Sequence, residues 1–323
     1  MSEERAPLMS VVVVTPDDYL TVRKTIKHLR TQTVSRSLEL VLVAPSLDGL
    51  KLEESEMRDF LGYRIVEVGP VHSTAKARAA GVCAATAPVV ALTEDHAYPA
   101  PGWAEALIKR HQEDWAAVGP VMHNANPHSM TSWASFLVEY SPWLGPAESG
   151  ECEHLPGHNG TYKRDILLEY GDRLEEMLDA ESILHWDLRA KGHRLWLESE
   201  ARTFHQNFSN PASTIPLRFN GGRLFASARA RAWPAWRRII FVLASPVIPL
   251  VRCFRITRDL RKPGRPRHLL PRLLPSLLFS LAFDGAGEMV GYAFGPGRAM
   301  ANLSDMEFHR HRYIRERRKP SER

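Results

Sequence analysis

The sequence predicts an α/β protein in which a mostly parallel, Rossmann-like sheet is flanked by helices. Two observations predict this fold class: short apolar runs alternate with helical patterns, and the runs end in polar turns. Strand–helix alternation is typical of parallel sheets, whose ligands bind outside the carboxyl ends of the strands. The 323 residues are 44% apolar and 24% charged, which excludes a disordered, collagen-like or polytopic membrane chain. A chain of this length buries a large core without disulfides.

The expected elements follow one another along the N-terminal part. Each predicted strand is a short apolar run bounded by turn residues. We expect strands at residues 11–14, 38–43, 63–68 and 88–92. Helices are expected over residues 20–30, from their apolar spacing, and over the alanine-rich residues 74–85. A later helix is expected to open at Glu181 and to be capped by Gly192.

Cysteine usage and the first residues favour a reducing, cytosolic setting. The chain has three cysteines, Cys83, Cys152 and Cys253, which are far apart and form no C-x-x-C pair. This spacing fits neither a disulfide framework nor a cysteine-rich zinc module. Residues 1–7 are polar and charged, so we expect no signal sequence.

Charge divides the chain into two regions. Residues 218–323 hold 22 Lys and Arg against 7 Asp and Glu, a net charge of +15. Residues 1–217 hold the remaining 20 basic and 30 acidic residues, a net charge of −10. We therefore expect an α/β domain over residues 1–217 and a basic helical region over residues 218–323 that faces an anionic partner.

Two apolar runs in the basic region flank an arginine-rich segment. Residues 239–251 and 269–283 are interrupted by prolines and polar residues, so neither reaches the ~20 clean apolar residues of a simple spanning helix. Residues 252–268 between them carry seven Arg and Lys. This alternation favours an interfacial or re-entrant element on an anionic membrane surface, with two buried helices of a soluble subdomain as the alternative. No nucleic acid is expected as a partner, because aromatics are not interleaved with the arginines.

Three parts of the α/β region carry residues suited to catalysis or metal binding. In the turn after the fourth strand, side-chain alternation places Glu94 and His96 on one side, where they can share a metal, and Asp95 on the other. An acidic turn without a function is the alternative. Glu181 opens a helix, a position that the helix dipole alone also favours. His205, near the end of the α/β region, is a candidate metal ligand, and a purely structural histidine is the alternative.

A glycine-rich loop is the fourth candidate. Gly157 and Gly160 bracket His158 and Asn159 just before a helical pattern. Such a loop lets backbone N–H groups approach an anionic ligand closely. Glycines before helices are common, so this signal alone is weak.

Taken in order, these segments resemble a family 2 glycosyltransferase of GT-A fold, of the membrane-associated bacterial type. The resemblance covers about residues 8–210 and is continuous over residues 75–103, from Ala-Lys-Ala-Arg-Ala-Ala-Gly to Pro-Gly-Trp. Residues 285–295 also resemble a C-terminal element of membrane-bound members. The resemblance implies inverting transfer of a sugar from a nucleotide sugar, a UDP-sugar first of all, to a lipid-linked saccharide or related glycan. It places the protein at the cytoplasmic face of the inner membrane, as a peripheral, monotopic or re-entrant protein.

The resemblance also implies a role for each candidate residue. Glu181 falls where the family has its catalytic base, and residues 94–96 correspond to the family's D-x-D motif. A divalent metal would be held by Glu94, His96 and His205, and imidazole ligands favour Mn²⁺ over Mg²⁺. The residues expected to bind the donor are Thr15, Pro16, Asp48, Arg78, Glu94 and Asp95. The residues expected to shape the acceptor loop are Gly157, His158, Asn159, Gly160 and Trp186.

Departures from the family pattern leave the identity of the donor's nucleotide undetermined. The acidic residue usual at the end of the second strand is absent from residues 44–46, Ala-Pro-Ser, and Asp48 is the candidate substitute. The Gln-x-x-Arg-Trp motif of processive synthases is also absent, which favours the addition of one sugar per event. Two alternatives remain open: an inactive nucleotide-sugar-binding membrane protein, and a soluble transferase acting on a small molecule.

Overall fold

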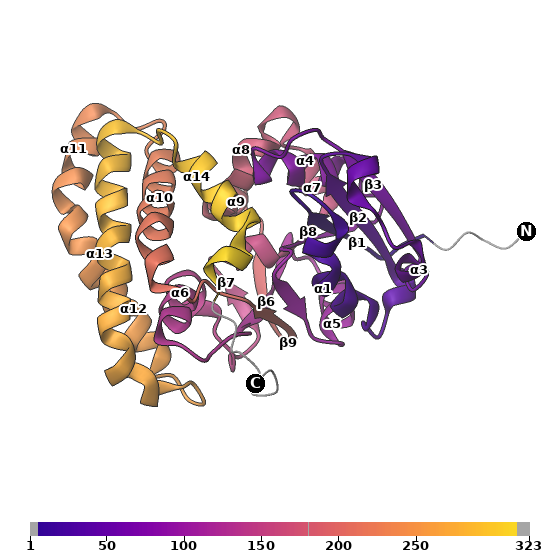
Figure 1. Cartoon of the computed structure of the whole chain (residues 1–323), viewed down its shortest axis with the longest axis horizontal. Coiled ribbons are helices and arrows are strands. Elements are labelled where there is room, and N and C mark those ends of the chain that lie inside the picture. Colours follow the sequence, from indigo (N-terminus) through magenta and orange to yellow (C-terminus); the bar gives the residue numbers. More distant parts are fainter. Residues whose placement is uncertain (1–5, 180, 315–323) are drawn as a thin grey trace, which may run out of the picture. The chain divides into compact units, whose positions relative to one another are not determined.

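The structure, a computed structural model, describes residues 6–179 and 181–314. It divides into two compact units (Figure 1). The sheet unit comprises the described residues of Met1–His123 and Trp143–His205. The helical unit comprises Asn124–Pro142 and the described residues of Gln206–Arg323.

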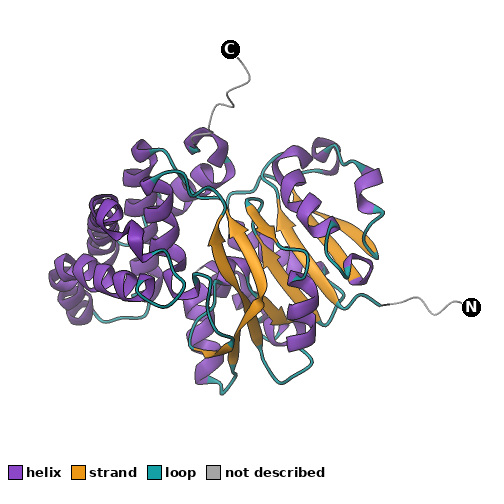
Figure 2. Cartoon of the chain, turned by 90° about the horizontal axis from the view of Figure 1, so that it is seen from below, coloured by secondary structure: helices purple, strands orange, loops and turns teal. Residues whose placement is uncertain are grey.

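The described strands form one mixed sheet (Figure 2), in the order β3-β2-β1-β4-β8-β6-β9-β5, with β7 beside β9. Their bounds are β1 Met9–Val14, β2 Leu38–Ala44, β3 Gly62–Glu67, β4 Val89–Thr93, β5 Ala97–Pro99, β6 Ala117–Asn124, β7 Gly150–Cys152, β8 Thr161–Lys163 and β9 Leu195–His205. The first four strands pair in parallel, as expected, and the α/β prediction is confirmed. The pairs β4–β8, β6–β8, β5–β9 and β7–β9 are antiparallel. The sequence did not predict this half, since three of its strands have only three residues each.

The predicted strands owe their form to burial on both faces of the sheet. Every residue of β1, β2 and β4 is buried. Continuous apolar runs of this kind are typical of central strands covered by helices. β3 lies at the edge of the sheet and is largely exposed.

Several helices of the sheet unit begin directly after a residue whose side chain caps them. The helices of this unit are α1 Tyr19–Arg30, α2 Leu47–Leu50, α3 Glu54–Met57, α4 Thr74–Ala84, α5 Trp103–Arg110, α7 Arg164–Leu168, α8 Leu174–Asp179 and α9 Glu181–Ala190. The side chain of Asp18 caps α1 by accepting from the first backbone N–H groups. In α4, a methyl group at Gly81 would overlap the side chain of Val12 on β1. The small residues of this alanine-rich helix therefore allow it to lie close to the sheet.

The helical unit is built around a closely packed pair of helices. Its helices are α6 Met130–Tyr140, α10 Pro211–Arg229, α11 Ala235–Ala244, α12 Ile248–Leu260, α13 Leu270–Phe294 and α14 Ala299–Phe308. A methyl group at Gly222 on α10, or at Gly287 or Gly291 on α13, would overlap the backbone of the facing helix. These glycines let the two helices approach at backbone distance, as small residues do in close helix pairs.

The arginine-rich segment is helical at its start, which differs from the expected pattern of two runs and a basic connection. α12 contains the end of the first apolar run together with Arg252, Arg255 and Arg258. Arg252 forms ion pairs with Asp284 and, at 3.6 Å, with Glu288, both on α13. By length and composition, Ala235–Leu260 and Arg267–Phe294 are each long and apolar enough to cross a membrane.

Candidate metal centre

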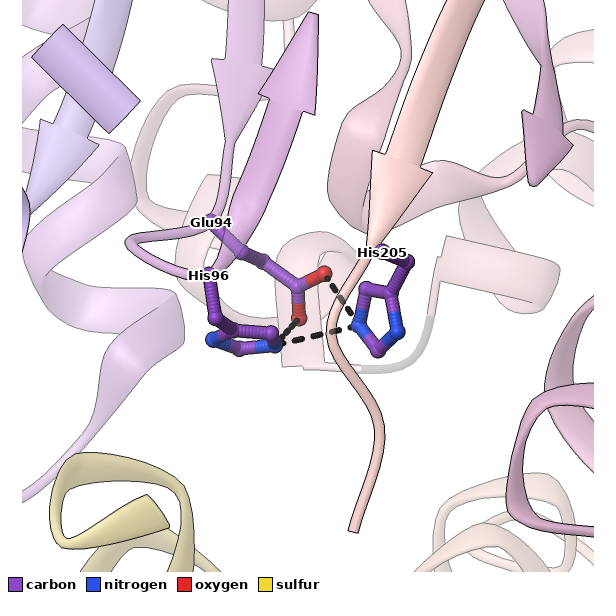
Figure 3. A group of neighbouring side chains, drawn as sticks. All are labelled: Glu94, His96 and His205. Atoms are coloured by element: carbon purple, nitrogen blue, oxygen red, sulfur yellow. Dashed lines mark hydrogen bonds and ion pairs between the residues drawn. The ribbon is translucent and has the colours of Figure 1, made fainter. Parts of the chain in front are cut away.

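Three side chains from the turn between β4 and β5 and from the end of β9 converge in the sheet unit: Glu94, His96 and His205 (Figure 3). Glu94 follows β4 directly, His96 precedes β5, and His205 is the last residue of β9. Ala97 of β5 pairs with His205 of β9. This pairing brings together His96 and His205, which are 109 positions apart in the sequence.

The geometry of the cluster suits a metal ion. One ligand atom from each side chain lies within 4.8 Å of the others. His96 Nε2 is 3.0 Å from His205 Nε2 and 3.6 Å from Glu94 Oε1, and His205 Nε2 is 3.3 Å from Glu94 Oε2. Burial alone would raise the pKa of Glu94, but the rings of His96 and His205 hold that pKa well below its usual range. The group is therefore an ionised carboxylate facing two buried imidazoles.

The turn that carries Glu94 and His96 is held by hydrogen bonds. The hydroxyl of Thr25 on α1 donates to the backbone oxygen of Asp95 at 2.6 Å. Asp95 Oδ1 lies 2.5 Å from His96 Nδ1. Asp95 does not belong to the cluster, and its carboxylate contacts the ring nitrogen of His96 that does not face Glu94 and His205. The interaction leaves Nε2 of His96 directed at Glu94 and His205.

The glycine-rich loop lies against the same carboxylate. Gly157–Asn159 form a short 3-10 turn, and Gly160 follows in extended conformation. Asn159, which is buried, donates from Nδ2 to Glu94 Oε2 at 2.7 Å. The backbone oxygen of Gly160 accepts from Leu92 N on β4 at 2.9 Å. The loop thus holds Glu94 in place, a role that sequence reasoning did not assign to it.

Arg78 adds a buried positive charge beside the cluster. It projects from α4, donates from Nη1 to His158 Nδ1, and lies 4.0 Å from Glu94 Oε1 through Nη2. A guanidinium has no acceptor and stays protonated. This hydrogen bond requires the neutral tautomer of His158 that accepts at Nδ1 and carries its ring proton on Nε2.

The other predicted donor and acceptor residues are spread over the sheet unit. Thr15 is buried at the end of β1, where its hydroxyl donates at 2.7 Å to the backbone oxygen three residues on. Pro16 next to it is half-buried, and Asp48 is exposed on α2. Trp186 on α9 is 38% exposed, and its indole N–H donates to His154 Nε2 at 3.2 Å.

The predicted base lies at the start of α9. This helix begins at Glu181 as expected, and Gly192 follows it with φ of 87°. The side chain of Glu181 lies outside what the structure describes. One turn later, the buried His185 has its Nε2 3.0 Å from the Tyr162 hydroxyl of β8, which joins α9 to the sheet. Sequence reasoning missed His185, since nothing in a lone histidine on a helix indicates a partner on a strand.

Comparison with known proteins gives one similar curated protein. A glucosyl-dolichyl phosphate glucuronosyltransferase from Haloferax volcanii is 29% identical over 184 residues. The match covers 50% of this chain and 55% of the relative, so the chain spans about half the length of the protein it matches. No protein family profile matches the chain.

The solved structures that are similar in three dimensions include GalNAc-T7 and S. aureus TarS. GalNAc-T7, crystallised with UDP, GalNAc and Mn²⁺, superposes with a TM-score of 0.47 at 15% identity over 63% of this chain and 44% of its own. Residues 1–349 of S. aureus TarS, in complex with UDP, superpose with a TM-score of 0.48 at 15% identity over 96% of this chain and 93% of TarS.

Proposed function

We propose that the chain is a metal-dependent, inverting glycosyltransferase of GT-A fold. The observation that carries this proposal is the cluster of Glu94, His96 and His205. Two ligand atoms bound to one metal ion at roughly 2.1 Å each lie about 3.0–3.4 Å apart, according to the coordination geometry. The separations of 3.0 Å between the two imidazoles and 3.3 Å between His205 and Glu94 fall in this range, and the 3.6 Å between His96 and Glu94 is slightly longer. The similarity to a curated glycosyltransferase over half of the chain supports the same class of enzyme.

The ligand set favours Mn²⁺ over Mg²⁺. Two of the three ligand atoms are imidazole nitrogens, whereas Mg²⁺ prefers an all-oxygen shell. The contact between Asp95 and His96 Nδ1 supports a metal-binding role for His96. Metal-ligating histidines commonly donate their second ring N–H to a carboxylate, which fixes the ring and its tautomer.

The proposed donor is a nucleotide sugar, a UDP-sugar first of all. Arg78 would neutralise charge on its diphosphate, because its guanidinium is buried beside the carboxylate cluster. Thr15, Pro16 and Asp48 would line the nucleotide pocket at the carboxyl ends of β1 and β2. Gly157–Asn159 and Trp186 would shape the acceptor side.

Glu181 is the proposed general base of a single displacement. A bound divalent ion supplies Lewis-acid stabilisation of the leaving diphosphate. The acceptor hydroxyl oxygen forms a bond to the anomeric carbon while Glu181 takes the hydroxyl proton. The bond between the anomeric carbon and the diphosphate breaks, and the nucleoside diphosphate departs with the electron pair. One displacement inverts the anomeric configuration, and a positioned base contributes ~10²–10⁴-fold to such a step.

The proposed acceptor is a lipid-linked saccharide or related glycan at the cytoplasmic face of the membrane. Three observations support a location at the membrane. The helical unit contains two segments long and apolar enough for a membrane, and its sequence is strongly basic. The curated relative is by its name a transferase acting on a dolichyl phosphate sugar.

The test is binding of a panel of nucleotide sugars to the detergent-purified protein, with Mn²⁺ and then with EDTA. We expect one donor to bind with the metal and to be lost with EDTA. His205→Ala should abolish the metal-dependent binding. His128→Ala, which changes an exposed histidine of the helical unit, should not. Failure of the folded protein to bind any donor would contradict the proposal, and binding without transfer to any acceptor would favour the inactive alternative.

A further inference from the structure

The segment α11–α12 carries a continuous apolar stripe on its outer side. Eight large apolar residues lie along it, each with another member three or four positions away, and each is between 41 and 75% exposed. They are Trp236, Ile239, Ile240, Leu243, Val247, Leu250, Val251 and Phe254. Spacings of three and four keep residues on one side of a helix. The stripe therefore follows one side of α11 and one side of α12, and Val247, in the 3-10 turn Ser245–Val247 that joins the two helices, is exposed between them. An exposed apolar patch of this size marks an interaction site.

The other side of the same segment packs on protein. α11 and α12 both lie along α13 (Figure 1). Ser245 between them and Ile256 on α12 are buried. Gly285 of α13 approaches Pro249 so closely that a methyl group at Gly285 would be 2.8 Å from the proline ring. The segment is therefore amphipathic in the folded protein, with one side covered and one side bare.

Charged groups behind the stripe argue against a membrane-crossing path. Arg252 of α12 is paired with Asp284 and Glu288, which are buried in the middle of α13. α13 in turn packs at backbone distance on α10. α10 carries the buried Arg218, which donates to Glu139 at 2.7 Å. A bilayer-spanning path would bring these ionised groups, or their packed neighbours, to the depth of the lipid chains, where such groups are rare and costly.

Exposed basic residues lie at both ends of the stripe. Arg231 and Arg237 are exposed near its start. The exposed basic residues at its other end are Arg255, Arg258, Arg261 and Lys262. A basic amphipathic helix with this arrangement lies in the plane of the interface, with its apolar side among the lipid chains and its cations at anionic headgroups.

We infer that α11–α12 inserts in the plane of one leaflet, without crossing the bilayer, and binds anionic phospholipid. This inference rests on the membrane location proposed above and names the mode of attachment. The stripe supplies the apolar contact, and the basic residues at its two ends supply the preference for anionic headgroups. The helices behind it keep their charged groups out of the lipid.

The first experiment measures binding of the full chain to preformed vesicles of phosphatidylcholine, with and without phosphatidylglycerol. We expect binding that requires the anionic lipid, and a loss of roughly fivefold for each of Arg255→Gln and Arg258→Gln. Leu243→Glu should weaken binding by about tenfold or more, because it places a charge at a residue that is 75% exposed on the stripe. Leu20→Glu is the matched control, since Leu20 is 69% exposed on the sheet unit and should not matter. Phe254→Glu is a second stripe variant if Leu243→Glu does not fold.

The second experiment separates an in-plane from a spanning segment. Cysteines are placed at Ala232 and Lys262, exposed positions on either side of α11–α12, in a protein whose native cysteines are serine. The vesicle-bound protein is then treated with a membrane-impermeant maleimide. In-plane insertion predicts that Ala232→Cys and Lys262→Cys are both labelled.

Protection of one of these sites would overturn in-plane insertion and leave the membrane location standing. Absence of binding to any vesicle, for instance because two copies pair through the stripe, would overturn both the inference and the location. Neither result would touch the donor-binding test of the transferase, which is done in detergent.

Discussion

Replacement of Asp95 tests whether its carboxylate supports His96 as a metal ligand. Asp95 Oδ1 is 2.5 Å from His96 Nδ1, and its side chain is only 16% exposed. Loss of a carboxylate partner behind a metal-ligating histidine costs 10–100-fold in metal affinity, about 1.4–2.7 kcal/mol. Asp95→Ala removes both the charge and the hydrogen-bond acceptor. Because the contact is short and largely shielded from water, we expect this variant to lose about 100-fold.

Asp95→Asn separates the two contributions. The amide oxygen can still accept from His96 Nδ1, but the negative charge is gone. We expect a loss of about tenfold in Mn²⁺ affinity, the lower end of the same range. Asp114→Asn is the control, because Asp114 is fully exposed and pairs with Lys163 on the surface. It should leave the affinity unchanged.

The assay is titration of Mn²⁺ followed by electron paramagnetic resonance of the free ion, which needs no turnover. Affinity unchanged in Asp95→Ala, in a protein whose His96→Ala variant binds no Mn²⁺, would refute the positioning role. If His96→Ala and Asp95→Ala both bind Mn²⁺ with unchanged affinity, the metal site itself is refuted.

Three further predictions concern packing, pH and catalysis. Gly287→Ala should destabilise the helical unit by about 1–3 kcal/mol in urea unfolding, because the added methyl overlaps the backbone of Phe219 on α10. Gly221→Ala on α10 is the control and should leave the stability unchanged, because its added methyl meets open space. Glu39→Gln should lower stability at neutral pH, and its difference from the natural protein should shrink below about pH 4. Burial would raise the pKa of Glu39, but the hydrogen bonds that its carboxylate accepts outweigh burial and lower that pKa. The carboxylate therefore stabilises the fold at pH values above the ordinary pKa of Glu, and this stabilisation is lost as the pH falls. Glu181→Gln should keep donor binding and lose transfer by ~10²–10⁴-fold in a single-turnover assay.

Each of these has a result that counts against it. Equal urea midpoints for the two glycine variants would mean that α10 and α13 are not in backbone contact. A Glu39→Gln difference that is constant with pH would show that this carboxylate does not titrate on unfolding. Full transfer by Glu181→Gln would require another base.

The local part of the fold could be predicted from the sequence. β1, β2 and β4 were visible because central parallel strands are buried on both faces and are therefore apolar at most positions. The turn after β4 was visible because Glu94 and His96 interrupt such a run. The nominations of Glu181 and His205 depended on the resemblance to a family, since neither stands out by local pattern.

The tertiary structure decided what surrounds those residues. His205 reaches Glu94 only through the register of β5 with β9, two strands that are distant in the sequence. The hold of Asn159 on Glu94 likewise depends on where a loop meets another strand. No periodicity encodes these pairings, because hydrogen-bond register between distant segments follows from the packing of the whole sheet.

The same division applies to the helical unit. Composition alone indicated apolar runs among arginines, and therefore a membrane surface. The packing of α13 against α11 and α12 decides which side of these two helices is exposed. It also decides that Arg252 pairs with Asp284 while Arg255 is exposed. A helix exposes whichever side its partners leave uncovered. The sequence therefore determined which apolar and basic residues α11–α12 contains, and the tertiary structure determined which of them are exposed.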